Sequence, residues 1–351
     1  MVALFIISLF TSFFVFAEEG TSIYQKNDLN TSTSSTQQVE EMFSYLGRAG
    51  NNAEEYFDNL QKVLSSFEED HLLKIEPQAY PKIAIKLETT YAPGMHTSVF
   101  LVEALLEWLK RRGFKKQNIV LFDRNVDGLK AAGFLADSGG SNDFKGHRVI
   151  SSLDPGYFLA GWFHDSPLPP TSFDRAKFIL KFPTDATARL QQERKSYLPA
   201  PIFEDAYWIN LAVPKDDVFL GIDGASSNMT LGSMSNHGRF RQKKTMAPAT
   251  VAEVMAIPEI WDKRIFSILD FSTFQIANGQ RFDSQFSEKE SSFLLGRNPF
   301  AIDYLAWKVI NKQRKERGFS VRSVTNSLLL RYAEELGLGV PRKTILKKMR
   351  N

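Results

Sequence analysis

The chain has 351 residues, of which 43% are hydrophobic and 24% are charged, and it contains no cysteine. These fractions are those of an ordinary globular protein and argue against a mostly disordered chain. The absence of cysteine excludes disulfides, cysteine-ligated zinc, protein-bound iron–sulfur clusters and a cysteine nucleophile. The net charge of +3, from 43 basic and 40 acidic residues, is too small to indicate nucleic-acid binding, and no nucleic-acid partner is expected.

The first segment, residues 1–17, has the character of a cleavable signal peptide. It contains no charged side chain, ends in the small residue Ala17 and is followed directly by two glutamates. Signal peptidases need a small residue at the cleavage site, which predicts cleavage after Ala17 and an exported protein, periplasmic or extracellular. The alternatives are an uncleaved membrane anchor, for which 17 residues are short, and a wrongly assigned start.

The flanks of the predicted domain are polar. Residues 18–52 cannot bury enough apolar area to offset their ordering entropy, so we predict a flexible tether. Apolar residues then recur at helical spacing from 54 to 73, which predicts a helix packed against the main domain. We expect the folded domain to span 53–341 and the basic residues 342–351 to form a solvated tail.

The organised core begins with a strand, a helix and a strand. Residues 82–87 (KIAIKL) and 118–123 (NIVLFD) predict strands, and residues 99–112, which precede Gly113, predict a helix. This βαβ unit implies a right-handed crossover in a parallel sheet. The expected fold class is therefore α/β, with a mostly parallel sheet flanked by helices.

Beyond this unit the chain predicts a loop-rich insertion and then further regular elements. Glycine and proline punctuate residues 134–200, where only 149–150 and 178–182 suggest short strands. The later part predicts strands at 205–213, 264–274 and 293–295, and helices at 250–257, 299–317 and 321–336.

The standard catalytic signatures are absent. The sequence contains no GxGxxG, GxxxxGK[ST], HExxH or GxSxG pattern, so dinucleotide oxidoreductases, P-loop NTPases, zincins and α/β-hydrolases have no direct support. None of the five histidines forms a close pair at metal-ligand spacing, and we predict no metal site.

Two regions at the ends of predicted strands could bind a ligand. The loop after the strand 82–87 carries Thr97 and lies where the carboxyl ends of parallel strands form a ligand crevice; the alternative is a polar connection with a helix cap. The glycine-rich run after the strand 205–213 carries Asn228 and His237, which could bind an anion; the alternative is a mobile surface loop.

Two aspartates form a third candidate. Asp270 follows the hydrophobic residues of a predicted strand, and Asp303 lies in the helix that Asn298 and Pro299 begin. The alternative role of each is that of an ordinary capping or ion-pairing carboxylate.

Several short motifs occur in an order that resembles a known family. They are KIAIK at 82–86 with the Pro93-Gly94 loop and Thr97, DAYWINLAVPK at 205–215, Asn228 and His237, FSILD ending at Asp270, and LGRNPFAID ending at Asp303. Together, over residues 80–318, they resemble the DUF362 family of uncharacterised bacterial and archaeal proteins. Each motif is short, so the resemblance depends on their order and spacing.

The chain departs from that family at several positions. Ser227 stands where lysine is common, Asp216 and Asp217 stand where a histidine often follows Lys215, and Asn298 replaces an aspartate. Many relatives are described as iron–sulfur proteins because of attached cysteines, a role that a cysteine-free chain cannot take.

The leading hypothesis is an exported protein that binds a small anionic ligand at the carboxyl ends of its parallel strands, with enzymatic turnover as an extension of that role. In this hypothesis Lys86, Lys215 and Arg239 supply positive charge, Asn228 orients the ligand, and His237 supplies a proton or a metal contact. The predicted ligand-binding set is completed by Thr97, Asp270 and Asp303. A racemase-like reaction that uses Lys215 and His237 is an analogy from their order in the chain.

The alternative hypothesis is a non-catalytic envelope protein, tethered by residues 18–52, whose site is degenerate. Both hypotheses leave the cofactor and the oligomeric state open and exclude an iron–sulfur cluster. Both also expect membrane contact only through residues 1–17.

Overall fold

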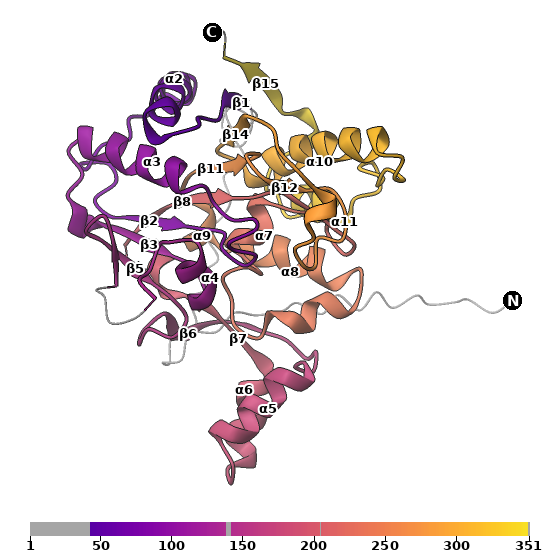
Figure 1. The fold of residues 1–351 in the computed structure, drawn as a ribbon. Helices are drawn as coiled ribbons and strands as arrows, with labels where there is room; N and C mark the ends of the chain where they lie inside the picture. The colour runs from indigo at the N-terminus through magenta and orange to yellow at the C-terminus, as the bar shows by residue number, and fades with distance from the viewer. Residues whose placement is uncertain (1–42, 138–141, 204, 350–351) are drawn as a thin grey trace, which may run out of the picture.

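The computed structural model describes residues 43–137, 142–203 and 205–349 and is built on a nine-stranded sheet (Figure 1). The five strands from β11 to β5 run parallel to one another, whereas β14 is antiparallel to β11 and β4 is antiparallel to β5. This confirms the predicted α/β class. The spatial order of the strands is β15 (Ile345–Lys348), β1 (Phe43–Arg48), β14 (Ser292–Gly296), β11 (Arg264–Asp270), β8 (Tyr207–Ala212), β2 (Ile83–Lys86), β3 (Ile119–Phe122), β5 (His147–Ile150) and β4 (Asp143–Phe144).

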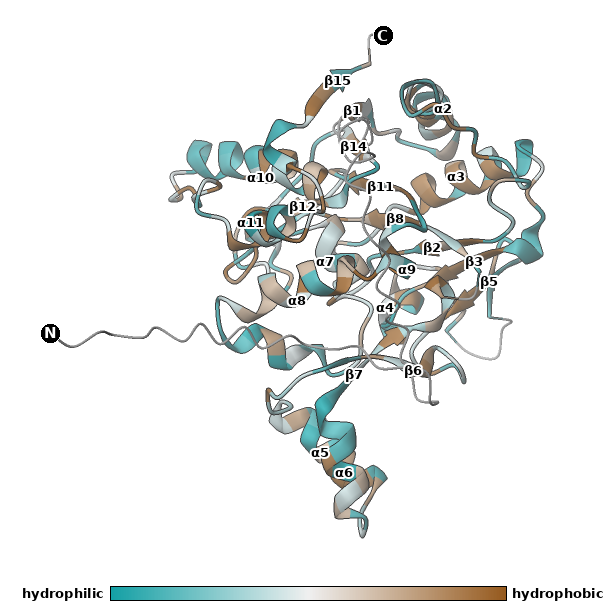
Figure 2. Ribbon diagram, turned by 180° about the vertical axis from the view of Figure 1, so that it is seen from behind, coloured by the Kyte–Doolittle hydropathy of each residue, from teal (hydrophilic) through white to brown (hydrophobic). Residues whose placement is uncertain are grey.

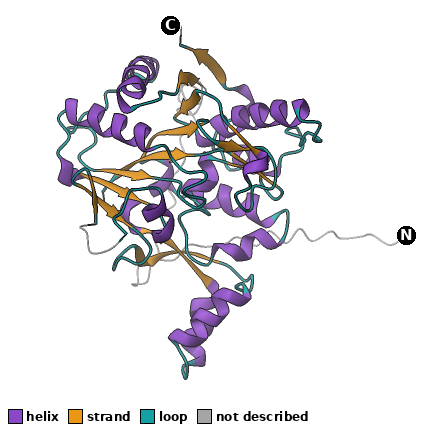
Figure 3. Cartoon of the chain, in the orientation of Figure 1, coloured by secondary structure: helices purple, strands orange, loops and turns teal. Residues whose placement is uncertain are grey.

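Helices cover both faces of the sheet (Figure 3), because its central strands are apolar on both sides. Successive side chains point to opposite faces, so Ile83 and Ile85 lie in one buried cluster and Ala84 lies in the other. The first cluster receives α2 (Ala53–Asp70), α3 (Val99–Arg111) and α4 (Val126–Ala131). The second receives α7 (Ala225–Met229), α8 (Met246–Met255), α9 (Pro258–Trp261), α10 (Pro299–Glu316) and α11 (Leu328–Glu335).

Local sequence signals account for the helix boundaries. The side chain of Asn52 accepts the backbone N–H of Glu55 at 2.9 Å and begins α2. Asn298 caps α10 in the same way, with Pro299 at the first helical position. Figure 2 shows the hydrophobic residues concentrated on the central strands, while the outer part of α10 is hydrophilic. In the part of the chain that the structure describes, no helix is long and apolar enough to cross a membrane.

A second sheet of four strands is formed by the segments that follow β8 and β11 in the sequence. Its order is β10 (Gly221–Asp223), β9 (Lys215–Asp217), β12 (Phe274–Gln275) and β13 (Ser287–Glu288). β9 and β10 form a hairpin, and β9 follows β8 after only two residues. Short 3₁₀ turns complete the fold: η1 (Lys116–Asn118), η2 (Ala200–Ile202), η3 (His237–Gln242), η4 (Ser284–Phe286) and η5 (Pro341–Lys343).

Residues 134–200 contain more regular structure than the predicted loop-rich insertion, and the strand predicted at 149–150 is confirmed within β5. This stretch contains β4, β5 and a projecting arm formed by β6 (Phe158–Asp165), α5 (Ser172–Lys181), α6 (Ala186–Arg194) and β7 (Lys195–Pro199), with β6 paired to β7 (Figure 1). The predicted strand 178–182 lies mostly in α5, because Thr171 caps a helix there and its side chain accepts the backbone N–H of Asp174.

Both predicted domain boundaries also require correction. Residues 43–48, assigned to the tether, form β1 between β14 and β15, and residues 345–348, assigned to the basic tail, form β15. Polar composition placed both segments in the flanks, and they are strands because β1 pairs with β14 on one side and with β15 on the other. The last predicted helix, 321–336, is shorter, since α11 begins at Leu328. The predicted signal peptide 1–17 and the rest of the tether, 18–42, lie outside the described residues.

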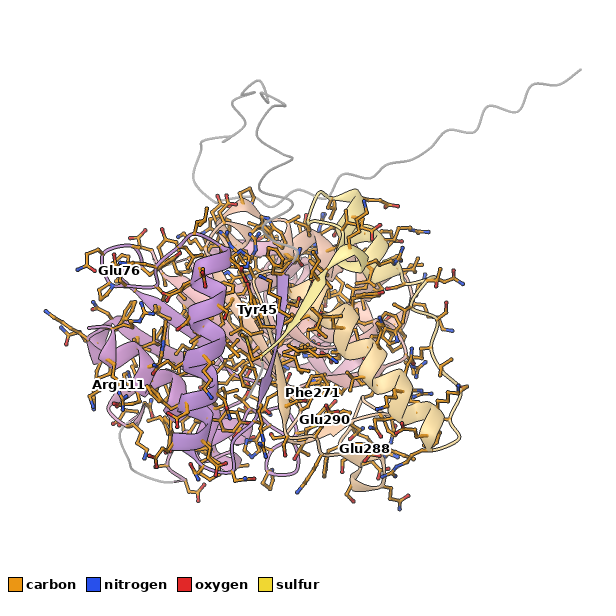
Figure 4. The ribbon with its side chains drawn as sticks, turned by 90° about the horizontal axis from the view of Figure 1, so that it is seen from above. Tyr45, Glu76, Arg111, Phe271, Glu288 and Glu290 are labelled. Atoms are coloured by element: carbon orange, nitrogen blue, oxygen red, sulfur yellow. The ribbon has the colours of Figure 1, made fainter. Side chains whose placement is uncertain are left out.

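Tyr45 offers a test of the corrected N-terminal boundary. It is fully buried beside α2 (Figure 4), its ring packs against Phe67 with centres 6.0 Å apart, and its hydroxyl donates to Asp70 at 2.6 Å. We expect Tyr45→Ala to lower the free energy of unfolding by about 3 kcal/mol or more in a denaturant titration. The control Arg48→Ala, at the exposed end of the same strand, should change it by less than about 0.5 kcal/mol. Equal stabilities for both variants would restore the tether interpretation.

Candidate functional site

Two neighbouring parallel strands bring a buried ion pair together at their carboxyl ends. Lys86 ends β2, and Asp123 directly follows β3, whose last residue is in register with Lys86. The Lys86 ammonium lies 2.8 Å from the Asp123 carboxylate and also donates to the side-chain oxygen of Asn228 at 2.8 Å. The other Asp123 oxygen accepts the backbone N–H and the hydroxyl of Thr89. Pairing of this kind offsets the cost of removing both charges from water.

The short helix α7 places Asn228 in this position. The Asn228 side-chain amide donates to Asn210 of β8 at 2.8 Å, and the Asn210 amide donates to the carbonyl of Ala225 at 2.8 Å. At the start of the helix, the buried Asp303 carboxylate accepts the backbone N–H groups of Ala225 and Ser226 at 2.6 and 3.0 Å. Asp303, predicted as a ligand-binding residue, is therefore a positioning residue for α7.

A second buried ion pair is centred on Lys215, the first residue of β9. Its ammonium lies 3.2 Å from the Glu88 carboxylate and 3.6 Å from that of Asp223. The centre of the Tyr91 ring is 5.4 Å away. Burial alone would lower the pKa of Lys215, but the Asp223 and Glu88 carboxylates outweigh it and raise that pKa above its ordinary value. Lys215 therefore remains a cation, which suits it to stabilise negative charge rather than to accept a proton.

The carboxyl partners respond in the opposite direction. Burial alone would raise the pKa of Glu88 and of Asp223. It is outweighed by Lys215 together with Lys86 at Glu88, and by Lys215 together with Arg241 at Asp223, so both pKa values are lowered. Arg241 also contributes at Asp223, from which its guanidinium lies 2.8 Å away, and it pairs with Asp217 as well. The carboxylates of Glu88, Asp223 and Asp217 are therefore each paired with a cation of the protein.

Asp216 and Asp217 follow Lys215, where a histidine is common in the DUF362 family, and both are ion-paired. Asp217 pairs with Arg241 on the side of β9 that carries Lys215. Asp216 contacts the guanidinium of Arg322, with a second contact at 2.8 Å, and lies 3.2 Å from Arg314 of α10. These residues therefore hold β9 against the elements around it.

His237 lies at the edge of this network. Its Nδ1 atom is buried and has no hydrogen-bond partner among the described residues. Burial lowers the pKa of His237 well below its ordinary value, the cations Arg124 and Arg241 lower it further, and the Asp223 carboxylate opposes them. The imidazole is therefore neutral at neutral pH. Asp223 contacts Lys215 and also acts on the pKa of His237, but no hydrogen bond or ion pair joins the two predicted catalytic residues within the part of the chain that the structure describes.

Two other predicted site residues, Thr97 and Asp270, make contacts that hold the protein together. The Thr97 hydroxyl accepts the backbone N–H of Glu88 at 2.8 Å and donates to the carbonyl of Leu211 at 2.7 Å, which fixes the loop after β2. Asp270 accepts from the Tyr56 hydroxyl at 3.1 Å, on the side of the sheet covered by α2.

Arg239 is the clearest misplacement among the predicted residues. Its side chain is fully buried and donates only to backbone carbonyls at the base of the arm, including those of Leu168 at 3.0 Å and Arg194 at 3.2 Å. The guanidinium thus anchors the arm to the body. The basic residue that joins the ion-pair network is Arg241, two positions further along the chain.

Sequence reasoning also missed several members of the site. Asp123 and Arg124 directly follow an apolar strand, a position that the rule on carboxyl ends of parallel strands would have selected. Glu88 lies two residues after Lys86 in the loop already singled out. Asp223 and Arg241 carry no such signal, because each is recognised only by what it contacts through space.

A resident metal ion would need a cluster of ligating side chains. Within residues 43–137, 142–203 and 205–349, no group of three or more histidine, aspartate or glutamate side chains is arranged to hold one. The carboxylates that converge on the site face ammonium and guanidinium groups instead.

Comparison with known proteins adds little to this description. No protein-family model matches the sequence, and no curated protein matches it. A crystal structure of a Thermotoga maritima protein from the Northeast Structural Genomics Consortium aligns at 12% identity with a TM-score of 0.35. The alignment covers 62% of this chain and 50% of that protein. Similarity this weak supports neither a fold family nor an activity.

The burial of Asp303 predicts a pH-dependent stability. Burial raises the pKa of Asp303 from 3.8 to about 7, although the hydrogen bonds from Ser226 and Ala225 lower it. The folded state therefore holds a proton that the unfolded state releases at lower pH. The resulting stabilisation is complete below about pH 4 and is lost as the pH rises through 7.

Comparison of wild type with Asp303→Asn isolates this effect, because the variant has no carboxyl group to titrate. The free energy of unfolding of the wild type, relative to that of the variant, should fall by about 3 kcal/mol between pH 5 and pH 8. Denaturant titrations of both proteins at the two pH values measure it. A difference that stays constant with pH would mean that Asp303 does not titrate in this interval.

Proposed function

We propose that the protein binds a small anionic ligand at the outer edge of the ion-pair network, beside Arg124, Arg241 and His237. The proposal rests on a difference in ion pairing between the interior of the network and its edge. Deep in the network, Lys86 and Lys215 are paired with carboxylates. At the edge, Arg124 donates to a backbone carbonyl at 3.4 Å and has no carboxylate partner among the described residues. An anion would supply the missing partner.

His237 adds a second reason for an anion at this place. Its buried Nδ1 lacks a partner, and nearby cations help to hold its pKa down. A bound anion would raise that pKa, because an opposite charge favours the protonated imidazole. The protonated ring would then donate a hydrogen bond, so ligand binding and proton uptake at His237 would be coupled.

The same arrangement supports catalytic turnover as an extension of the proposal. Lys215 is a fixed cation held by Glu88 and Asp223, so it would stabilise negative charge that develops on a bound substrate. Proton transfer would fall to His237, whose neutral imidazole can accept a proton. A racemase-like role for Lys215 as a base has no support in its raised pKa.

We propose in addition that the chain is a divergent member of the DUF362 family. Of the residues in the motifs that carry the resemblance, Lys86 contacts Asp123 and Asn228, and Lys215 contacts Glu88. The Lys86 cation also helps to lower the pKa of Glu88. This supports a shared site but names no reaction.

The competing proposal, a non-catalytic envelope protein with a degenerate site, has one observation in its favour. Lys86 and Lys215 are each about 98% buried or more, and each is already paired inside the protein. Buried pairs of this kind also occur where they only specify a structure. A binding experiment at the edge of the network separates the two proposals.

Sulfate is a suitable probe, because its charge does not change between pH 5.5 and pH 8. We expect isothermal titration calorimetry to detect sulfate binding by the wild type, and Arg124→Ala to weaken it about tenfold or more through loss of a charged hydrogen bond. The affinity should rise as the pH falls, and His237→Asn should abolish this pH dependence.

Arg148→Ala is the matched control, since it removes an exposed arginine from β5 and should leave the affinity unchanged. Absence of binding, or equal binding by the wild type and Arg124→Ala, would contradict the proposal and leave the envelope-protein alternative.

Export is a separate proposal, supported by the apolar, uncharged segment 1–17. When the full chain is produced in a bacterial host, we expect the mature protein to begin at Glu18, as measured by intact mass and N-terminal sequencing. Ala17→Trp should block cleavage, because signal peptidases require a small residue there. Recovery of the wild type with residues 1–17 still attached would contradict cleavage after Ala17.

A further inference from the structure

The arm that projects from the body presents an unusual surface. Its helices α5 and α6 contact one another but contain no buried residue (Figure 1). Arg239 fixes the base of the arm through backbone carbonyls, so the arm has a defined attachment. A helix pair held in this way away from the body has surface available for contact with something outside the chain.

Large apolar side chains lie exposed on both helices. Phe173 and Leu180 of α5 are 69% and 81% exposed, and Leu190 of α6 is 66% exposed. Phe173, Ala176 and Leu180 are spaced three and four residues apart and therefore share one face of α5. Figure 2 shows hydrophobic and hydrophilic residues side by side on this arm. The apolar stripe formed by these three α5 residues faces solvent instead of a protein core.

Cations accompany this stripe. The Lys177 ammonium lies 4.3 Å from the centre of the Phe173 ring, and the Lys181 ammonium lies 5.3 Å from that of Phe182. Neither lysine has a carboxylate partner among the described residues. The arm's carboxylates are used locally instead: the Asp185 side chain, for example, caps the backbone N–H of Ala188. Helix α5 therefore presents exposed apolar side chains next to lysines that have no carboxylate partner among the described residues.

We propose that the arm docks on an anionic lipid bilayer. Phe173 and Leu180 would enter the boundary between headgroups and acyl chains, and Lys177 and Lys181 would reach the lipid phosphates. Lysine is depleted from the centres of protein–protein interfaces, whereas at lipid surfaces its alkyl stem lies along apolar groups while its ammonium stays in the headgroup layer. The interleaving of lysine with Phe173 and Leu180 fits the lipid surface better. This inference is independent of the anion site.

The absence of cysteine makes the docking directly observable. Leu180→Cys introduces the only thiol of the full chain, to which an environment-sensitive nitrobenzoxadiazole dye is attached. We expect its emission to rise severalfold and shift to the blue on vesicles of phosphatidylcholine with phosphatidylglycerol, and to stay unchanged on phosphatidylcholine alone. The same dye at Leu153→Cys, an exposed leucine outside the arm, should not respond.

Charge reversal tests the role of the lysines. Lys177→Glu with Lys181→Glu, introduced into the labelled Leu180→Cys protein, should weaken binding to the anionic vesicles tenfold or more. Both lysines are exposed, and circular dichroism checks that the variant keeps its helices. Because residues 1–17 are the same in every variant, any membrane binding through that segment cannot produce a difference between label positions.

Four results would overturn the proposal. They are no emission change at position 180, an equal change at 153, an equal response to uncharged vesicles, and unaltered binding after charge reversal. Emission that rises with protein concentration in the absence of vesicles would show instead that a second copy of this chain covers the stripe.

Discussion

The pairing of buried charges at the carboxyl ends of β2, β3 and β8 is the constraint on which this part of the molecule depends. An ammonium group removed from water costs several kcal/mol unless carboxylates and hydrogen-bond acceptors surround it. Lys86 satisfies this requirement with Asp123 and Asn228, and Lys215 satisfies it with Glu88 and Asp223. The loops after β2 and β3, the β9–β10 hairpin and α7 must all lie where they supply these partners.

The same pairing determines what chemistry the site can perform. Carboxylates that stabilise Lys215 also raise its pKa, so the lysine best placed at the site is a fixed charge rather than a base. Direct ion pairing ends at Arg124, which has no carboxylate partner among the described residues, and at His237, whose Nδ1 has no hydrogen-bond partner there. Any small anion would be attracted to that edge and not to the neutralised interior, which is why the proposed function is located there.

Local signals in the sequence predicted the scaffold well. The βαβ unit, the Asn298 cap of α10 and the apolar central strands each depend on residues within about one helical turn or one strand of each other. The same reasoning failed for β1, which lies in a segment assigned to the tether and forms by pairing with β14 and β15, and for 178–182, where a Thr171 cap begins a helix. It also misplaced Arg239, whose partners are backbone carbonyls about 70 and 45 residues away in the chain.

The sequence by itself determined the α/β class, the βαβ unit, the start of α10 and, through its lack of cysteine, the exclusion of disulfide and iron–sulfur chemistry. It also selected Lys86, Lys215, Asn228 and His237 from their positions after strands. Tertiary structure alone decided which charges meet. Lys215 and Glu88 are 127 positions apart, and Lys86 and Asn228 are 142 apart. Caps and periodicity act over a few residues, whereas an ion pair forms wherever the fold brings two side chains within about 4 Å and keeps water out.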